Sequence, residues 1–173
     1  MILDFDKSLL VLGGARSGKS RFAQTQAENS PGDLVYIATA QPLDAEMADR
    51  IARHRHDRGP RWRTVEAPQE LTNAISDNSR CDNVLLIDCL TLWASNLMFA
   101  ERDISAEIAA LTTAISNAPG RIILVSNEVG LGVVPDNALA RQFRDVAGEI
   151  NQEVARIADS VVFVMSGLPV VLK

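Results

Sequence analysis

Five short apolar segments recur along the chain, and longer segments with helical spacing separate them. They are Leu9–Leu12, Leu34–Ala38, Val84–Leu90, Ile122–Val125 and Val161–Met165. Such nearly continuous apolar runs are typical of strands buried on both faces of a parallel sheet. Strands that alternate with helices predict an α/β fold, with right-handed crossovers and ligands at the carboxyl ends of the strands. We therefore expect a mostly parallel sheet flanked by helices, with room for short antiparallel strands at the C-terminus.

Length and composition indicate one globular domain. The chain has 173 residues, of which 47% are hydrophobic and 23% are charged, as in an ordinary domain with a substantial core. The Pro/Gly clusters Ser30–Gly32 and Ala118–Gly120 are short enough to be simple connections between elements. We predict a single catalytic domain spanning residues 1–173.

Composition also excludes several classes of protein. No apolar run of the sequence approaches the length that crosses a bilayer, and Asp4 and Asp6 stand where a signal peptide would carry bases. We therefore expect a cytoplasmic protein without membrane insertion. The net charge of −5 disfavours a large polyanionic partner, and the arginines and lysines are not clustered in the sequence, so we expect no nucleic-acid partner. Cys81 and Cys89 are too few for a disulfide framework or a zinc site, so we expect both to be reduced packing residues.

The segment Gly13–Ser20 matches the phosphate-binding pattern G-x-x-x-x-G-K-[ST]. The first apolar segment runs directly into it and Arg21–Glu28 contains good helix formers, so the required strand, loop and helix are present. The alternative is a Gly-rich turn before an ordinary helix. In a phosphate-binding loop, backbone N–H groups surround phosphate oxygens, the lysine adds positive charge and the last hydroxyl binds Mg²⁺. This predicts a nucleoside triphosphate site in a P-loop NTPase-like domain, formed by Gly13, Gly14, Ala15, Arg16, Ser17, Gly18, Lys19 and Ser20, with Ser20 on the metal.

Asp88 follows the apolar residues of the third predicted strand. A carboxylate there is costly unless it is paired, exposed or facing a cation, and P-loop enzymes commonly place a Mg²⁺-organising acid at a strand end. We predict that Asp88 is the second metal residue. The alternative is a cap for the helix that Thr91–Ala94 predicts, or an ordinary aspartate at a strand end. Asn127 and Glu128 end the next strand in the same way, and we expect them to border the same crevice, with a capping role as the alternative.

Residues Asp44–Arg58 predict a helix with acids early and bases late, as the helix dipole favours. The helix contains both histidines of the chain. At about 100° per residue, His54 lies roughly 20° from Met47, whereas His56 points away from that apolar stripe. A histidine on an apolar face is commonly a core residue, so the helical geometry alone leaves a core role and a catalytic role open. The arginines of this helix suit phosphate binding or a solvated face.

An ordered set of segments in this chain resembles a known enzyme family. The segments are Gly13–Arg21, Tyr36–Ala40, Arg50–Arg55 and Asn127–Pro135, followed by Leu139–Arg141, Phe143–Asp145, Gly148, Asn151–Gln152 and Ser166–Pro169. Over essentially all of its length after Lys7, the chain resembles the bifunctional adenosylcobinamide kinase / adenosylcobinamide-phosphate guanylyltransferase family. The P-loop is generic, whereas the Asn-Glu-Val-Gly and terminal Ser-Gly segments are more specific.

The resemblance implies two reactions in cobalamin biosynthesis. The first phosphorylates the aminopropanol hydroxyl of adenosylcobinamide with a nucleoside triphosphate. The second transfers GMP from GTP onto that phosphate through a guanylylated histidine, giving adenosylcobinamide-GDP and pyrophosphate. The resemblance also implies GTP and ATP as substrates, Mg²⁺ as cofactor and a homo-oligomer, with a homotrimer suggested by the family.

The resemblance assigns roles to particular residues. The Arg-Ile-x-x-His pattern places the nucleophile at His54, with His56 as the rival if the alignment register shifts. Glu66 is an alternative to Glu70 as a nucleotide contact, because the two acids lie close together in the sequence. The implied nucleotide contacts outside the P-loop are Ala38, Thr39, Ala40, Arg55, Asp57, Glu70 and Asp88.

Two other interpretations remain at this point. In an ordinary small-molecule P-loop kinase, His54 would be only structural. A GTPase or nucleotide-switched binding protein usually reads guanine with an Asn-Lys-x-Asp motif, which this sequence does not contain. Covalent labelling by GTP separates the first alternative from the bifunctional enzyme.

Overall fold

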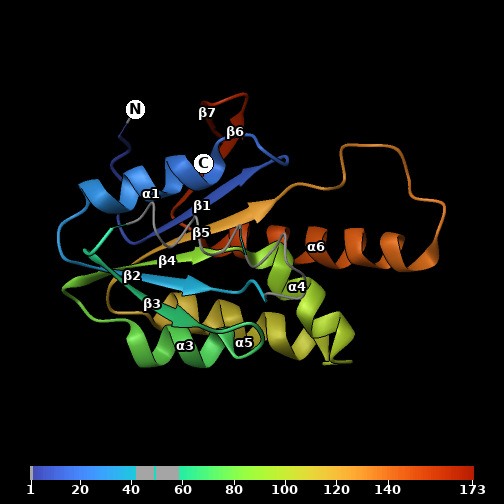
Figure 1. Ribbon diagram of the computed structural model, residues 1–173, viewed down its shortest axis with the longest axis horizontal. Coiled ribbons are helices and arrows are strands. Elements are labelled where there is room, and N and C mark those ends of the chain that lie inside the picture. The colour runs from blue at the N-terminus through green and yellow to red at the C-terminus, as the bar shows by residue number, and fades with distance from the viewer. Residues whose placement is uncertain (1, 42–48, 50–58) are drawn as a thin grey trace.

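The computed structural model describes residues 2–41, 49 and 59–173. A seven-stranded sheet forms its centre, in the order β3-β2-β4-β5-β1-β6-β7 (Figure 1). Neighbouring strands are parallel, except that β6 and β7 are antiparallel. The predicted α/β fold with antiparallel C-terminal strands is confirmed. The strands are β1 Ser8–Gly13, β2 Asp33–Ala38, β3 Trp62–Glu66, β4 Asn83–Asp88, β5 Arg121–Asn127, β6 Ser160–Met165 and β7 Leu168–Val171.

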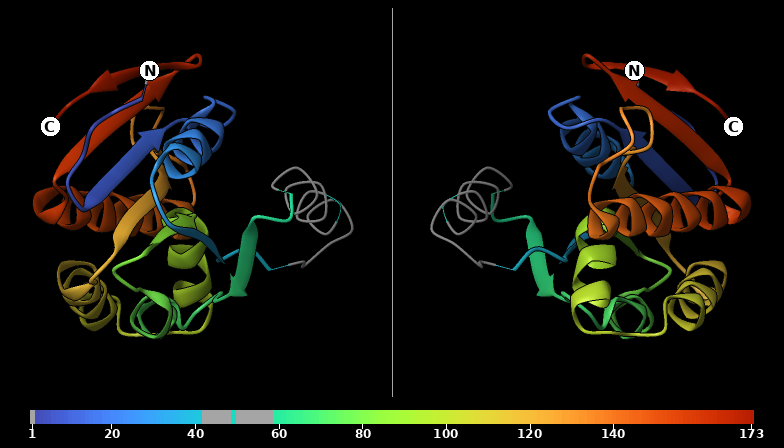
Figure 2. Two further views of the ribbon diagram at one scale, coloured as in Figure 1. Left: turned by 90° about the vertical axis from the view of Figure 1, so that its left-hand side faces the viewer. Right: turned by 90° about the vertical axis from the view of Figure 1, so that its right-hand side faces the viewer.

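Helices cover both faces of the sheet. One face packs against α1, and the other packs against α3, α4, α5 and α6, as the two apolar clusters and the views in Figure 2 show. The predicted helix after the P-loop is confirmed as α1. The helices are α1 Lys19–Asn29, α3 Leu71–Asn78, α4 Leu90–Phe99, α5 Ile104–Asn117 and α6 Ala138–Ile157.

The two clusters show how side chains alternate along each strand. In β5, Ile122 and Leu124 pack toward α3–α6, whereas Ile123 and Val125 pack toward α1. The period of two is what an extended strand dictates. The alternation also tells on which face of the sheet a polar residue at the end of a strand lies, because every second residue shares a face.

The predicted strand Val84–Leu90 extends too far at its C-terminal end. Strand β4 stops at Asp88, and Leu90 already begins α4. Leu90 is fully buried in the helix, so an apolar run by itself could not distinguish a strand from a buried helix start. Strand β3 was not predicted, because it lies at the edge of the sheet and its Arg63 and Glu66 are exposed.

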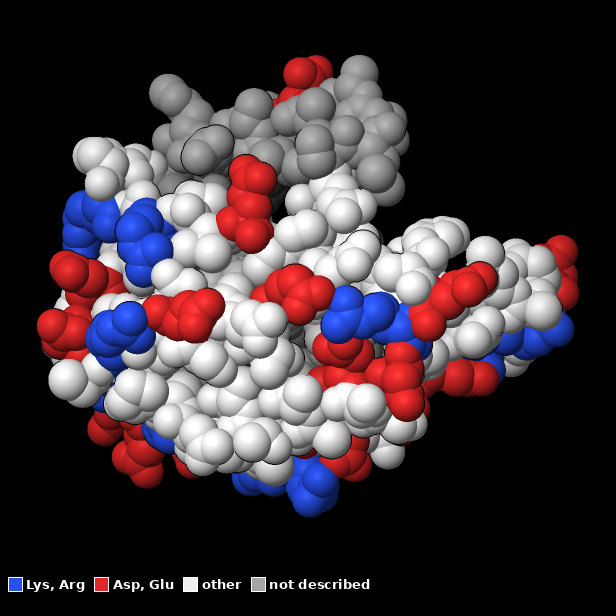
Figure 3. Space-filling model, turned by 90° about the horizontal axis from the view of Figure 1, so that it is seen from below, with Lys and Arg blue, Asp and Glu red and all other residues white. Residues whose placement is uncertain are grey.

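The surface carries charges of both signs. On the face shown in Figure 3, Lys and Arg side chains lie interspersed with Asp and Glu side chains. Cys81 is exposed and Cys89 is buried, so the packing role predicted for Cys81 was wrong, and both described thiols are free. Within the described part of the chain, the helices are too short or too polar to cross a membrane.

Candidate active site

The P-loop connects β1 to α1 at the carboxyl edge of the sheet. Arg16 and Gly18 adopt positive φ angles of 56° and 95°, which turn the chain tightly before the helix. A Cβ atom at Gly13 would lie 2.5 Å from the carbonyl oxygen of Val164 and 2.6 Å from Ser17 Oγ, so this position requires glycine. Lys19 is buried and its Nζ donates to the carbonyl oxygen of Gly14 over 3.1 Å.

The first turn of α1 is arranged to receive an anion. Its N-cap, Gly18, supplies no side-chain cap, and the first turn contains no acidic residue. Ser17 Oγ is buried and has no hydrogen-bond partner among the described residues, a condition that a ligand oxygen would relieve. Exposed N–H groups and the helix dipole attract phosphate at such a terminus.

Two segments from far along the chain support the loop. The β6–β7 turn has φ angles of 52° at Ser166 and 81° at Gly167, as in the tight turns that favour hairpins. Gly167 N–H donates to the carbonyl oxygen of Ser17 over 2.8 Å, and Glu128 N–H donates to that of Gly13 over 3.1 Å. The backbone of the loop is therefore held by β5 and by the C-terminal hairpin.

Asp88 lies on the same side of the sheet as the P-loop helix. Val84 and Leu86 of β4 pack toward α1, so the alternation of the strand directs half-buried Asp88 to that side. Burial and the nearby Asp88 carboxylate raise the pKa of the Cys89 thiol to about 11, while the Lys19 ammonium acts in the opposite direction. Both charges thus lie close to Cys89. The N-cap of α4 is Cys89, so the capping alternative for Asp88 is wrong.

Ser20 and Asp88 suit Mg²⁺ bound together with a triphosphate. Ser20 lies half-buried in the first turn of α1, and Asp88 lies at the end of β4. Mg²⁺ usually takes only one or two protein oxygens and completes its shell with phosphate oxygens and water. Among the described residues, no group of three or more His, Cys, Asp or Glu side chains could hold a metal. The donor set fits an ion that arrives with its nucleotide.

The ends of β2 and β4 are joined by Thr39. Its hydroxyl donates to the carbonyl oxygen of Cys89 over 2.7 Å and accepts from Cys89 N–H over 2.8 Å. Thr39 is fully buried, whereas Ala38 and Ala40 on either side are half-buried. The predicted nucleotide-contact segment Ala38–Ala40 therefore lies at the same edge of the sheet as Asp88, with the Thr39 side chain engaged in the fold.

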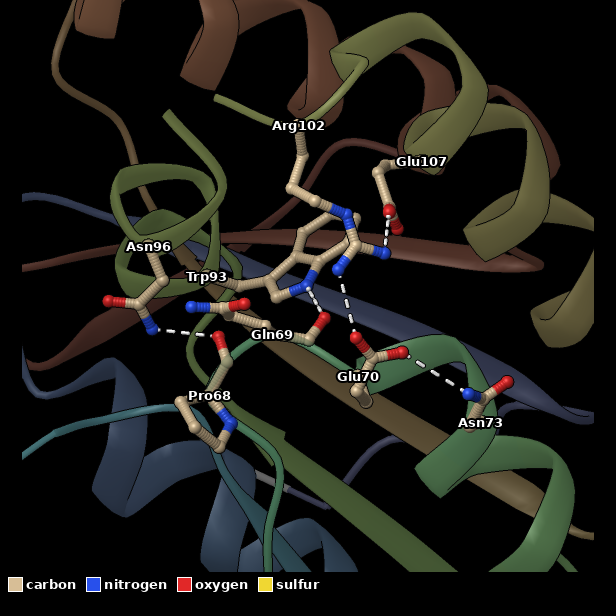
Figure 4. Close-up of polar contacts among 8 residues, drawn as sticks. All are labelled: Pro68, Gln69, Glu70, Asn73, Trp93, Asn96, Arg102 and Glu107. Carbon is tan, nitrogen blue, oxygen red and sulfur yellow. Dashed lines mark hydrogen bonds and ion pairs between the residues drawn. The ribbon is translucent and has the colours of Figure 1, made fainter. Parts of the chain in front are cut away.

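Helix α4 holds the segment that follows β3 (Figure 4). Asn96 Nδ2 donates to the carbonyl oxygens of Pro68 over 2.7 Å and Thr39 over 2.8 Å. Trp93 Nε1 donates to the carbonyl oxygen of Gln69 over 2.8 Å. These bonds attach the exits of both β2 and β3 to one helix.

Glu70 is exposed and takes part in an ion-pair network (Figure 4). Arg102 lies between Glu70, at 2.9 Å, and Glu107, and its hydrogen bonds to these two carboxylates raise the pKa of the guanidinium. Asn73 Nδ2 donates to the other carboxylate oxygen of Glu70 over 3.2 Å. Glu66, the alternative to Glu70, is exposed at the end of β3.

The predicted nucleophile and its neighbours lie outside the described residues. These are His54, Arg55 and Asp57, together with the rival His56. The predicted helix Asp44–Arg58 falls on the same part of the chain, apart from Asp49.

A buried polar group behind Asn127 was not predicted from the sequence. Thr91 of α4 and Asn151 of α6 are both buried and both bond to the backbone of Asn127. The available signal was a polar residue on the apolar stripe of α6, where Ala147 and Val154 are also buried. Glu128 Oε1 accepts from Gly130 N–H over 2.6 Å within the loop before α6, and the N-cap of α6 is Asn137, so neither Asn127 nor Glu128 caps that helix.

Comparison with known proteins decides the family. Residues 9–172 match the sequence model of the cobinamide kinase / cobinamide phosphate guanyltransferase family. The chain belongs to this family. The resemblance found from the motifs is thereby confirmed, and the protein is an enzyme, a nucleotide-binding transferase with the family's kinase and guanylyltransferase activities.

Full-length relatives agree with this assignment. The bifunctional adenosylcobalamin biosynthesis protein CobP of Pseudomonas aeruginosa is 47% identical over 166 residues, which cover 95% of this chain and 96% of CobP. The corresponding CobU protein of Salmonella typhimurium is 43% identical over 180 residues, covering 95% of this chain and 99% of CobU.

Solved structures of distant proteins share the fold. The flagellar accessory protein FlaH from Methanocaldococcus jannaschii aligns with a TM-score of 0.54 at 14% identity, over 99% of this chain and 80% of FlaH. An ATPase from a type III secretion system aligns with a TM-score of 0.53 at 13% identity, over 92% of this chain and 52% of the ATPase. At these identities the likeness concerns the P-loop NTPase-like fold alone.

Proposed function

We propose that this protein phosphorylates adenosylcobinamide with a nucleoside triphosphate and then converts the phosphate to adenosylcobinamide-GDP. GMP comes from GTP, passes through a guanylyl-histidine and leaves pyrophosphate as the second product. The observation that carries the proposal is the arrangement of the P-loop, Lys19 and Asp88 at one edge of the sheet, in a chain of this family.

In the kinase step, the substrate hydroxyl oxygen bonds to the γ-phosphorus as the bond from that phosphorus to the β–γ bridging oxygen breaks, and the hydroxyl proton passes to solvent. Backbone N–H groups of the P-loop and Lys19 hold the triphosphate in line for this displacement. Ser20 and Asp88 would hold Mg²⁺, which when bound would supply positive charge near the leaving phosphate. The residues themselves need form no covalent bond.

In the guanylyl step, a neutral imidazole nitrogen of His54 attacks the α-phosphorus of GTP and pyrophosphate departs. A phosphate oxygen of adenosylcobinamide phosphate then attacks the same phosphorus, and the P–N bond breaks. Each in-line displacement inverts the phosphorus. A chiral α-thio analogue of GTP should therefore give product with retained configuration, and net inversion would indicate one direct transfer.

Nucleotide contacts outside the P-loop form part of the proposal. They involve the segment at the end of β2, the acid after β3, two residues beyond the histidine and the acid that ends β4. Support for the first two comes from their position at the carboxyl edge, where parallel α/β sheets bind ligands. The proposed contacts are Ala38, Thr39, Ala40, Arg55, Asp57, Glu70 and Asp88.

The proposal extends to one cytoplasmic catalytic domain, residues 1–173, that assembles as a homo-oligomer, with a homotrimer suggested by the family. Large apolar side chains are exposed around the start of α6, with Leu131 at 79%, Val133 at 97% and Leu139 at 54%. Contiguous exposed apolar surface favours protein contacts. Light scattering at several protein concentrations tests the assembly, and a monomer at all of them would contradict it.

Mass spectrometry after incubation with GTP and Mg²⁺ tests the covalent route. The wild-type protein should gain the mass of GMP, and His54→Ala should lose the adduct while still phosphorylating adenosylcobinamide. Lys19→Ala should cripple both activities, because a charge-assisted phosphate contact contributes about 1.5–3 kcal/mol, or roughly tenfold to a hundredfold in binding. His56→Ala is the matched control. An adduct retained in His54→Ala and lost in His56→Ala would move the nucleophile by two positions.

A magnesium titration tests Asp88. Asp88→Asn keeps the shape of the side chain and removes its charge, so both reactions should need more Mg²⁺ for half-maximal rate. An unchanged titration would remove Asp88 from the metal site.

A further inference from the structure

Asn127 lies at the carboxyl end of β5, between the P-loop strand β1 and the Asp88 strand β4. It pairs with Gly13 in the parallel register. Ile123 and Val125 of the same strand pack toward α1, so the alternation continues to Asn127 and directs its side chain to the α1 side. By the same count Asp88 lies on that side. The half-buried Asn127 amide therefore faces the edge of the phosphate-binding loop.

Two helices hold the backbone of Asn127 from the opposite side of the sheet. Its N–H donates to Thr91 Oγ1 of α4 over 2.6 Å, and its carbonyl oxygen accepts from Asn151 Nδ2 of α6 over 3.1 Å. Thr91 and Asn151 are each only 5% exposed. Ser126, whose Oγ lies 3.1 Å from Thr91 Oγ1, completes the group. Both polar atoms of one backbone position are thus held by buried side chains.

Stability alone does not explain why a buried position of α6 holds an asparagine, Asn151. Its Oδ1 is buried without a hydrogen-bond partner among the described residues, and an unpaired buried oxygen is unfavourable. The neighbouring buried positions of α6 are apolar, as at Ile150 and Val154. An apolar residue at this position would avoid the unpaired oxygen and would release the carbonyl of Asn127. The amide is therefore used to hold that carbonyl.

The adjacent Glu128 does not suit the same task. Its carboxylate accepts from Gly130 N–H over 2.6 Å, and a negative charge would repel a phosphate. A neutral amide can donate to a phosphate oxygen without adding negative charge.

We propose that Asn127 is a catalytic residue whose side-chain amide donates a hydrogen bond to the terminal phosphate of the bound nucleoside triphosphate, and that Thr91 and Asn151 are positioning residues for it. This inference rests on the triphosphate site proposed above. In the kinase step, Asn127 neither gains nor loses a proton. It stabilises the negative charge on the γ-phosphoryl oxygens while the bond to the attacking hydroxyl forms and the bond to the β–γ bridging oxygen breaks.

Equilibrium binding separates this contact from general nucleotide affinity. Calorimetry with Mg²⁺ would compare α,β-methylene GTP with α,β-methylene GDP, neither of which can transfer GMP. Asn127→Ala should reduce the preference for the triphosphate over the diphosphate by about tenfold, with diphosphate affinity changed less than about twofold. Thr113→Ala, at an exposed position of α5, should retain the preference. Asn127→Ser provides a second variant if Asn127→Ala folds poorly.

The positioning residues have matched variants. Thr91→Val removes the hydroxyl at nearly constant volume and should reduce the same preference, whereas Thr91→Ser should restore it. Asn151→Leu should reduce the preference because the Asn127 carbonyl loses its donor, while loss of that bond and removal of the unpaired oxygen affect the melting temperature in opposite directions. A purely structural Asn151 would instead leave the preference unchanged.

Different results overturn different statements. An unchanged preference in Asn127→Ala and Asn127→Ser would overturn the contact with the terminal phosphate, while triphosphate binding by the wild-type protein would still support the proposed function. An unchanged preference in Thr91→Val and Asn151→Leu would overturn their positioning roles. Failure of the wild-type protein to bind the triphosphate analogue would overturn the proposed nucleotide site itself.

Discussion

Gly167 N–H donates a hydrogen bond to the carbonyl oxygen of Ser17 over 2.8 Å. This bond joins the turn between the last two strands to the loop that follows the first strand. Gly167 adopts a φ of 81°, and a Cβ atom there would meet open space. This position therefore requires a residue that tolerates a positive φ and keeps its N–H, whereas space for a side chain is available.

Substitutions at Gly167 separate the backbone angle from the hydrogen bond. Gly167→Pro removes the N–H and cannot adopt the positive φ, so nucleotide affinity should fall about tenfold as the loop loses its support. Gly167→Asn keeps the N–H and tolerates a positive φ, so it should bind nucleotide normally and lose about 1 kcal/mol or less of stability. Nucleotide titration and thermal unfolding measure the two effects. Equal nucleotide affinities in both variants would show that the hairpin does not support the loop.

Asn96 bonds to two strand exits with one amide nitrogen. Asn96→Asp replaces this donor by a carboxylate and leaves the carbonyl oxygens of Thr39 and Pro68 without it. We expect the free energy of unfolding to fall by about 2 kcal/mol in urea titrations. Ser95→Ala, the preceding residue of the same helix, is the control and should change stability by less than about 0.5 kcal/mol. Equal stability of the two variants would contradict the joining role of Asn96.

The two cysteines should react at very different rates. Exposed Cys81 should be modified by a thiol reagent in the native protein, whereas buried Cys89 should react only after unfolding. The Cys89 pKa is about 11 in the folded protein, above its ordinary value of 9.0, so the unfolded chain releases this proton first. Stability should be unaffected by this thiol below about pH 9 and should fall between about pH 9 and pH 11.

Variants of the two cysteines test whether Cys89 causes the loss of stability at alkaline pH. Cys89→Ala should reduce the decline above about pH 9, and Cys81→Ala should not. Rapid native modification of Cys89 in the Cys81→Ala variant would contradict its burial. Thermal unfolding across this pH range provides the stability measurement.

Asp159 joins the start of β1 to the end of α6. Burial opposes its ionisation, but hydrogen bonds from the Ser8 hydroxyl, Ser8 N–H and Lys7 N–H lower the pKa of its carboxyl. The contribution to stability is present above the unfolded value of 3.8 and is lost as the pH falls through the lower folded value. Asp159→Asn should cost about 1 kcal/mol at neutral pH, because the group is mostly exposed.

Acid titration of stability tests this assignment. The difference between wild type and Asp159→Asn should shrink as the pH falls below about 4. Asp6→Asn, at an exposed position, should leave stability nearly unchanged at neutral pH. A difference between wild type and Asp159→Asn that is constant down to pH 2 would show that ionisation of Asp159 does not contribute.

The sequence by itself determined the features that local patterns encode. Continuous apolar runs revealed the buried strands, because a strand covered on both faces has few polar positions. The phosphate loop was visible because its glycines, Lys19 and Ser20 are contiguous, and the ordered motifs were sufficient to assign the family. Strand β3 escaped detection because an edge strand exposes part of its side chains, and the end of β4 was misplaced because Leu90 is equally apolar in a helix.

Only the tertiary structure decided which distant residues act together. Hydrogen bonds join Thr39 to Cys89, Ser17 to Gly167, and Asn127 to both Thr91 and Asn151, all between positions far apart in the sequence. The side chain of Asn151 could have bonded to water, to its own helix or to a ligand. It bonds to Asn127 because α6 packs against this end of β5, and a hydrogen bond depends on distance and direction that residue type cannot specify.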